Sequence, residues 1–259
     1  MESPQTFLNL ATHAATEAGH LLLERFRRPA TGVETKTSST DPVSDADRDA
    51  EALIKRVIGS ERPNDRFLAE ESGGSEGDPR VTWIVDPLDG TVNYLFGIPV
   101  WAVSIAVEKD GLLVAGVVHD PNTHETFSAT FKGGARLNGR PIKVSDREDL
   151  TQALVGTGFA YDERTRDHQA EVVRRVLPRV RDVRRGGSAA LDLAFTACGR
   201  LDVFYEAHMQ AWDKAAGVLL IREAGGVVST LEEPYGDAHG VVAGPGPLHD
   251  ALRSIVTPE

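Results

Sequence analysis

The sequence of 259 residues has a single cysteine, Cys198, and this scarcity excludes a disulfide framework or a zinc site built from thiolates. Cys198 lies in an apolar helical segment, where we expect a buried and chemically inert thiol. The sequence has no run of eighteen apolar residues, so it predicts no membrane-spanning helix. Residues 1–10 also lack the basic and apolar regions of a secretory signal, and we therefore expect a cytoplasmic protein.

Positively charged residues are outnumbered by negatively charged ones, which gives a formal net charge of −11. Short basic runs such as residues 179–185 are expected to be solvated, and they do not form the basic stripe of a nucleic-acid surface. We therefore expect no direct contact with nucleic acid. The eight histidines show no metal-binding spacing. A phosphate-bearing ligand would need a cation to shield it from so acidic a chain.

Hydrophobic periodicity predicts two halves, residues 1–150 and 151–259. The first half should begin with amphipathic helices over residues 4–26 and 44–58 and continue into an antiparallel sheet, with the glycine-rich residues 133–141 as a loop. The second half alternates strands with helices, which indicates βαβ connections. We therefore predict an α/β (α+β) protein with an antiparallel first half and a mixed or parallel second half.

The most informative segment, residues 83–91, is an apolar run that ends in Asp86, Asp89, Gly90 and Thr91. A strand that ends in two carboxylates and passes directly into a helix can hold hard cations against a phosphate. The backbone N–H groups of Gly90 and Thr91 would then bind the phosphate oxygens. The same residue types are also common in a simple capped turn.

Acidic residues stand at three further boundaries between elements: residues 41–47, the pair Glu70 and Glu71, and Asp213. Any one of them is explained as a helix cap or a solvated charge. If folding brings the four groups into one cleft, their repulsion requires cations. Ligands that are all oxygen favour magnesium, manganese or calcium over zinc.

These segments resemble the inositol monophosphatase family. The resemblance is carried by Glu70-Glu71-Ser72, by residues 83–94, and by Trp212-Asp213-Lys214-Ala215-Ala216-Gly217 with Glu223-Ala224-Gly225-Gly226. Residues 155–159 and 185–194 are similar to the bacterial inositol-1-monophosphatases within it. The resemblance implies a layered α-β-α-β-α sandwich, a homodimer, and hydrolysis of a small-molecule phosphate ester, with myo-inositol 1-phosphate as the leading substrate.

The resemblance also implies two or three Mg²⁺ ions per subunit, with Mn²⁺ as a substitute. Glu70, Asp86 and the carbonyl of Leu88 would hold the first ion. Asp86, Asp89 and Asp213 would hold the second, and Glu70 would contribute to a weaker third. Inhibition by lithium is expected where a monovalent ion takes the second position.

For catalysis, the resemblance implies that the Thr91 hydroxyl orients the attacking water and donates a hydrogen bond to Asp47. It implies Glu70 as the third catalytic residue. Asp89, Ala189 and Glu206 would contact hydroxyl groups of the substrate, and Lys36 would lie on a loop over the site. Thr91 is too weak an acid to serve as the base alone, so it can only relay toward Asp47.

Several alternatives remain open at this stage. Residues 207–211 depart from the family pattern beside the sugar pocket, so histidinol phosphate, NADP and 3′-phosphoadenylates stay as candidate substrates. Fructose 1,6-bisphosphate needs a second phosphate site, for which Arg184 and Arg185 are the nearby cations. His208 is interpreted as an exposed loop residue. A different class of function is a regulatory protein that docks to the transcription machinery.

Overall fold

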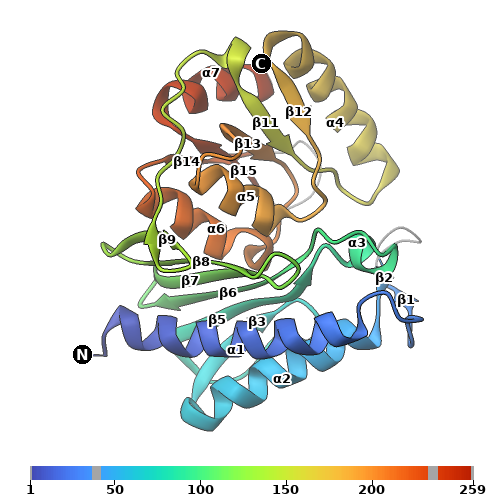
Figure 1. Cartoon of the computed structure of the whole chain (residues 1–259), viewed down its shortest axis with the longest axis vertical. Helices are drawn as coiled ribbons and strands as arrows, with labels where there is room; N and C mark the ends of the chain where they lie inside the picture. Colours follow the sequence, from blue (N-terminus) through green and yellow to red (C-terminus); the bar gives the residue numbers. More distant parts are fainter. Residues whose placement is uncertain (1, 37–41, 233–238, 258–259) are drawn as a thin grey trace.

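The structure, a computed structural model, describes residues 2–36, 42–232 and 239–257. Its elements stack in five layers (Figure 1). Helices α1 (Pro4–Arg25) and α2 (Asp45–Glu61) cover one face of an eight-stranded sheet, and α5 (Ala189–Ala197) and α6 (Ala211–Glu223) cover the other. A five-stranded sheet follows, and α4 (Glu163–Val176) and α7 (Gly246–Val256) close the stack. The predicted α-β-α-β-α sandwich is thereby confirmed.

The eight-stranded sheet has the order β10-β9-β8-β7-β6-β5-β3-β4. Its neighbouring strands pair antiparallel except β3 and β5, which are parallel. The strands are β3 (Asp65–Ala69), β4 (Gly73–Gly74), β5 (Asp78–Asp89), β6 (Ala102–Lys109), β7 (Leu112–Asp120), β8 (Glu125–Thr130), β9 (Gly134–Leu137) and β10 (Arg140–Pro141).

The five-stranded sheet has the order β12-β11-β13-β15-β14 and is mixed, as predicted. In it β11 pairs parallel with β12 and β13, whereas β15 pairs antiparallel with β13 and β14. Its strands are β11 (Leu154–Thr157), β12 (Asp182–Arg184), β13 (Val203–Glu206), β14 (Val227–Leu231) and β15 (Gly240–Gly244). The smaller elements are the pair β1 (Glu34–Thr35) and β2 (Pro42–Val43), the one-turn helix α3 (Thr91–Leu95), and the 3₁₀ turns η1 (Leu150–Gln152) and η2 (Leu177–Arg179).

The composition of each helix matches its layer. α1 and α2 are amphipathic because one side faces the sheet and the other faces solvent. α5 and α6 lie between two sheets and are accordingly apolar over most of their length, with residues 215–221 of α6 buried without interruption and Asp192 and Asp213 in their first turns. This middle layer forms one hydrophobic core with residues of both sheets. Within the described residues, no helix combines the length and apolar character that crossing a bilayer requires.

One detail differs from the sequence predictions. Residues 133–141 are not a loop, because β9 and β10 form a hairpin there, with left-handed Asn138 and Gly139 at its turn. Helix α4 ends at Val176, because Pro178 follows and the chain tightens into η2. The division at residue 150 into two domains stays a prediction.

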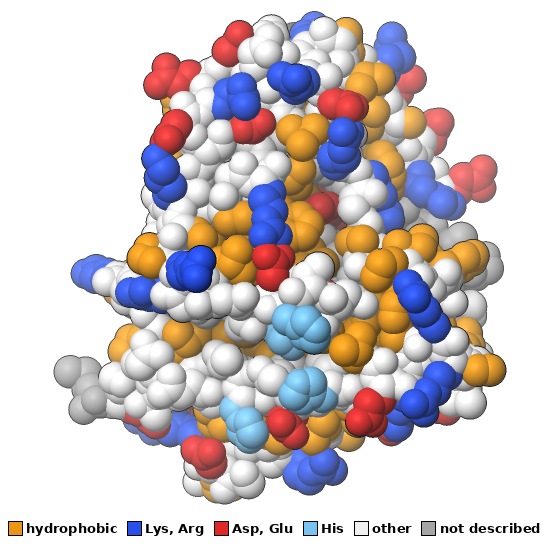
Figure 2. Space-filling model, in the orientation of Figure 1, with side chains coloured by type: hydrophobic (Ala, Val, Ile, Leu, Met, Phe, Trp, Pro, Cys, Tyr) orange, Lys and Arg blue, Asp and Glu red, His pale blue; other side chains and the backbone are white. Residues whose placement is uncertain are grey.

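On the face shown in Figure 2, Lys and Arg side chains are interspersed with acidic ones and form no continuous stripe.

Candidate active site

The end of β5 places the first two carboxylates of the site. On a regular strand, residues three apart point to opposite faces of the sheet. The pairing of β5 with β6 slips between Asp86 and Asp89, and this irregularity allows both side chains to line the same cavity. Asp86 is 2% exposed, and its Oδ1 accepts a hydrogen bond of 3.0 Å from the Leu88 N–H.

The turn after β5 requires glycine. Gly90 has a φ of 100°, and a Cβ there would stand 3.0 Å from the carbonyl oxygen of Val100. α3 follows at once and spans five residues. Gly90 and Thr91 both line the cavity beside Asp89. The contact of Gly90 and Thr91 with phosphate stays a prediction. Because a one-turn helix has a small dipole, such a contact would depend on hydrogen bonds from their individual N–H groups.

Thr91 joins α3 to α2. Its hydroxyl donates to Asp47 Oδ1 at 2.9 Å and approaches the Leu88 carbonyl oxygen at 3.1 Å. Asp47 is fully buried, and its Oδ2 accepts from the N–H and the hydroxyl of Ser44, at 2.9 and 2.6 Å. This capping arrangement at the start of α2 fixes the carboxylate that faces Thr91. The structure therefore brings Thr91 and Asp47 together as the sequence predicted.

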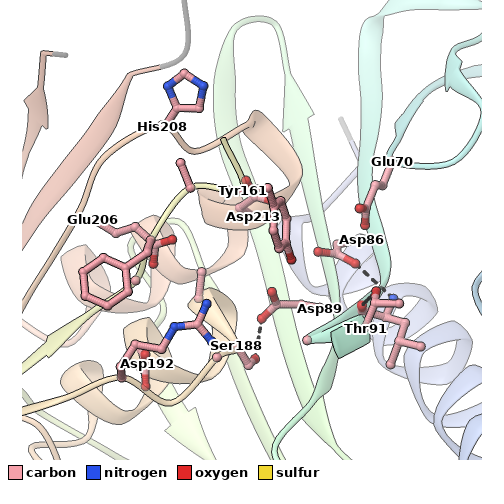
Figure 3. Close-up of a pocket in the computed structure, with 18 residues that line it drawn as sticks. Glu70, Asp86, Asp89, Thr91, Tyr161, Ser188, Asp192, Glu206, His208 and Asp213 are labelled. Atoms are coloured by element: carbon pink, nitrogen blue, oxygen red, sulfur yellow. Dashed lines mark hydrogen bonds between the residues drawn. The ribbon is translucent and has the colours of Figure 1, made fainter. Parts of the chain in front are cut away.

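Four predicted metal-binding residues line one cavity of about 150 Å³, namely Glu70, Asp86, Asp89 and Asp213 (Figure 3). Burial, followed by the charges of the other three acids, raises the pKa of Asp86 well above its ordinary value. Burial and then Glu70 and Asp89 raise the pKa of Asp213 to about 8. The neighbouring acids thus make the ionised forms of Asp86 and Asp213 less favourable, which is the signature of a cluster that positive charge would stabilise.

Among the residues that the structure describes, no three acidic, histidine or cysteine side chains stand close enough together to form a metal site as they are. The donor chemistry nevertheless fits a hard divalent cation. The four acids offer oxygen alone as ligand atoms, and Leu88, whose carbonyl is a further oxygen, also lines the cavity. Asp213 is held in place at the start of α6, where its Oδ2 accepts from the Gln210 N–H at 2.6 Å.

Lys36 contacts Glu70 beside the cavity, and its predicted contact with the substrate stays a prediction. It does not line the cavity, and its Nζ donates to Glu70 Oε1 at 2.7 Å and to Glu71 Oε1 at 2.6 Å. Although burial opposes it, the charge of Glu70 and then its hydrogen bond raise the pKa of Lys36. Lys36 therefore neutralises an acid that was expected to bind metal. Of the acids in residues 41–47, Asp45 is half-buried and paired with Arg48 at 3.1 Å, and Asp41 lies outside the described residues.

The opposite wall of the cavity comes from the second half of the chain. Glu206 at the end of β13 and Ala189 at the start of α5 both line it, as predicted. Burial and the charges of nearby acids, Asp213 first, raise the pKa of Glu206. Asp89 connects the two walls, because its Oδ2 accepts hydrogen bonds from the Ser188 hydroxyl and, at 2.8 Å, from the Ala190 N–H.

Two lining residues, Ser188 and Asp192, were not identified from the sequence, and Arg185 was named only as a candidate for a second phosphate site. Burial, together with the charge of Asp89, raises the pKa of Asp192 to about 7. Arg185 is the one arginine or lysine in this lining among the described residues, whereas Arg184 pairs with Asp182 at 2.6 Å. Residues 185–194 were recognised only as a motif, although its Arg, Ser and Asp were signals for these positions.

His208 is half-buried and lines the cavity, so its interpretation as an exposed loop residue was wrong. Its φ of 65° is unusual for a residue other than glycine. No feature of the sequence predicts this left-handed backbone conformation. The structural role of Asn93 was also missed from the sequence. Its Nδ2 donates to the carbonyl oxygens of Val100 and Gly186 and so connects α3 to the segment before α5.

The fold and the cavity together define a layered α/β protein with a carboxylate-lined site between its two sheets. The chain belongs to the inositol monophosphatase family, whose sequence profile matches residues 3–257. It is 44% identical over 258 residues to the Nus factor SuhB of Xylella fastidiosa, covering 96% of this chain and 94% of that protein. It is also 44% identical over 235 residues to the inositol-1-monophosphatase of Mycobacterium bovis, covering 86% and 81% of the two chains.

Solved structures agree with this assignment. The crystal structure of the extragenic suppressor protein suhB from Bartonella henselae superposes with a TM-score of 0.91 at 38% sequence identity. The match covers 97% of this chain and 98% of that one. The recognition of the family from the sequence motifs is thereby confirmed.

Proposed function

We propose that this chain is a Mg²⁺-dependent phosphatase that hydrolyses myo-inositol 1-phosphate to myo-inositol and phosphate. The observation that carries the proposal is a single cavity with hard oxygen ligands on one wall and hydroxyl-accepting carboxylates on the other (Figure 3). The names of several relatives, inositol-1-monophosphatases at 42–44% identity, support this substrate.

The metal ligands would be those that line the cavity. Glu70, Asp86 and the Leu88 carbonyl would hold one ion, and Asp86, Asp89 and Asp213 would hold another, with Glu70 contributing to a weaker third. When bound, two or three Mg²⁺ ions, or Mn²⁺ in their place, would neutralise the phosphate and lower the pKa of water.

Thr91 and Asp47 would prepare the attacking water. Because the Thr91 hydroxyl donates to Asp47, its lone pairs are left to accept a hydrogen bond from water. Asp47 Oδ2 is occupied by Ser44, so Oδ1 faces Thr91 in a fixed position. The water oxygen would bond to phosphorus while the bond from phosphorus to the inositol oxygen breaks, and that oxygen takes up a proton. This direct displacement needs no phosphorylated side chain.

The wall opposite the metal ligands favours a polyol. Asp89, Ala189 and Glu206 would contact the substrate, and the carboxylates of Glu206 and Asp192 can accept hydrogen bonds from its hydroxyl groups. A second phosphate or a nucleotide would need more cations than Arg185 alone supplies. Phosphate release from inositol 1-phosphate, histidinol phosphate, fructose 1,6-bisphosphate, NADP and 3′-phosphoadenylate, with Mg²⁺ titrated, tests the choice. Faster turnover of any of the other esters would overturn the substrate assignment.

A second candidate function is regulatory docking to the transcription machinery, since the relatives from Xylella fastidiosa and Escherichia coli are named Nus factor SuhB. A pull-down with the Asp86→Asn variant separates the two functions. Partners retained by the inactive variant would establish docking that does not depend on catalysis. If the variant releases no phosphate and captures no partner, the phosphatase function alone is supported.

We also propose a cytoplasmic homodimer that lithium inhibits. Light scattering of the purified protein measures the mass, and a monomer would contradict the first part. Inhibition by lithium in the millimolar range, competing with Mg²⁺, is the expected kinetic result.

A further inference from the structure

The loop of residues 158–161, between β11 and α4, forms part of the substrate wall. All four residues line the cavity. A Cβ at Gly158 would stand 2.1 Å from Glu206 Oε2, so the loop backbone packs directly against that carboxylate. The position of the loop therefore sets the position of Glu206 and the width of the cavity there.

Gln169 of α4 holds this loop from behind. It is 5% exposed, and its Oε1 accepts a hydrogen bond of 2.9 Å from the Ala160 N–H. Because the N–H group can only donate, the amide oxygen must face the loop and the NH₂ group must face away from it. Gln169 does not itself line the active cavity, so any effect on substrate must pass through the loop.

The space behind the loop is a second, very small cavity of about 10 Å³ that shares Gly158 and Phe159 with the first. Thr157, Gln169 and Tyr205 line it, at 1%, 5% and 5% exposure. Thr157 Oγ1, Gln169 Nε2 and the Tyr205 hydroxyl make no hydrogen bond of good geometry to the described residues. Burial raises the pKa of Tyr205, and the nearby Thr157 hydroxyl opposes that rise, so these two hydroxyls lie close to one another. Val172, Leu231 and Val256 supply apolar walls. A space of about 10–15 Å³ with two to four polar neighbours is what one water molecule needs.

We propose that Gln169 is a positioning residue for the substrate wall, and that one water molecule bound by Thr157, Gln169 and Tyr205 completes its support. The water accepts a hydrogen bond from the Gln169 amide and bonds to the two hydroxyls, which satisfies all three buried groups. Gln169 thereby joins α4 and β13, through Tyr205, to the loop that packs against Glu206. The kinetic part of this inference depends on the proposed phosphatase function.

The kinetic test uses Gln169→Met, which keeps the volume of the side chain but removes both hydrogen bonds. KM for inositol 1-phosphate should rise about 3- to 10-fold, as expected from one lost hydrogen bond, while kcat changes less than about 2-fold. Hydrolysis of p-nitrophenyl phosphate, which has no hydroxyl groups to reach Glu206, should keep its kcat/KM. Gln169→Glu retains the acceptor for Ala160 and should lie nearer the parent protein.

The matched control is Val176→Ala, a fully buried position on the same helix that lines neither cavity. It should lower the melting temperature without changing KM. If Gln169→Met impaired both esters equally, as a general packing defect would, the positioning role would be overturned.

A measurement without substrate keeps the inference separate from the proposed function. Amide exchange of Ala160 should become at least about 10-fold faster in Gln169→Met and stay unchanged in Val176→Ala, because only the first removes its acceptor. A crystal structure of the parent protein should contain one ordered water bonded to all three groups. Unchanged exchange at Ala160, or a dry cavity, would overturn the inference even if the phosphatase assignment holds. A protein that released no phosphate from inositol 1-phosphate would overturn only the assignment.

Discussion

At the scale of single residues, Thr91 connects three parts of the site. It begins α3, its hydroxyl donates to Asp47 on α2, and it lies beside the Leu88 carbonyl at the end of β5. One hydroxyl therefore couples the proposed water position to a carboxylate that is itself fixed by Ser44. Such a group is expected to affect the rate of the chemical step more than substrate affinity.

Thr91→Val should lower kcat about 10²-fold or more with little change in KM, because it removes the hydroxyl that orients water while keeping the branched shape. Steady-state kinetics with inositol 1-phosphate and saturating Mg²⁺ measures the effect. Thr91→Ser retains the hydroxyl and serves as the control. A Thr91→Val protein with nearly full kcat would exclude Thr91 from the proton path.

The fold disfavours the ionised form of Asp86 through burial and three neighbouring acids. Asp86→Asn should reduce Mg²⁺-dependent kcat by about 10³-fold, since it removes a ligand shared by both proposed ions. In the metal-free protein the same change should raise the melting temperature by about 2–4 °C, the shift expected from ~1 kcal/mol of relieved repulsion.

Thermal unfolding in a chelator and phosphate-release assays measure the two effects of Asp86→Asn. Asp45→Asn is the control, because Asp45 is a half-buried acid that pairs with Arg48 and does not line the cavity. An Asp86→Asn protein that kept its turnover would contradict the proposed ligand set.

At the scale of elements, the junction of β5 and α3 depends on one backbone position. Gly90→Ala should both destabilise the fold and lower kcat/KM at least about 10-fold, because the left-handed φ costs roughly 1–2 kcal/mol and the new methyl group meets the Val100 carbonyl. Gly111→Ala is the matched control, with a φ of 79° and no atom within 4 Å of the added Cβ. Equal losses of stability in the two variants would show that the close contact does not matter.

The same junction shows what could be predicted from the sequence. The apolar run, the paired acids and the Gly-Thr turn are local, so β5, Asp86 and Asp89 were identified from residues 83–91 alone. The bond from Ser188 to Asp89 and the tie from Asn93 to Gly186 were not, because each joins residues more than ninety positions apart. The hairpin of β9 and β10 was missed because its glycines also suit a loop, and the pairing with β8 that fixes it is a tertiary contact.

At the scale of the whole molecule, the cavity lies where the first sheet and the middle helices meet, so its charge acts on the stability of both halves. The folded-state pKa is about 6 for Asp89, where burial outweighs the hydrogen bonds from Ser188 and Ala190, and about 8 for Asp213. Both exceed the ordinary value of 3.8, so the metal-free folded state binds these protons more tightly than the unfolded chain. Their contribution to stability is fully present below that ordinary value and is lost as pH rises through the folded-state values.

Mg²⁺ should reverse this dependence. In a chelator, the parent protein should become less stable between pH 5 and 8, with a smaller decrease in Asp213→Asn. At a Mg²⁺ concentration of about 100 times Kd, binding adds ~2.7 kcal/mol, or about 5–10 °C in melting temperature, and the gain should be larger at pH 8 than at pH 5. Calorimetry over this pH range with and without Mg²⁺ checks the prediction. A Mg²⁺ effect that shrinks as pH rises would contradict it.

The two walls of the cavity come from separate stretches of the chain. Glu70, Asp86 and Asp89 belong to the first half, whereas Ala189, Asp192 and Glu206 belong to the second. Asp213 on α6, the remaining proposed metal ligand, also lies in the second half but beyond residue 210. Substrate selectivity and the rate of hydrolysis can consequently change independently during evolution. Chimeras that exchange residues 154–210 between relatives should inherit the preference of the donor and the turnover machinery of the recipient.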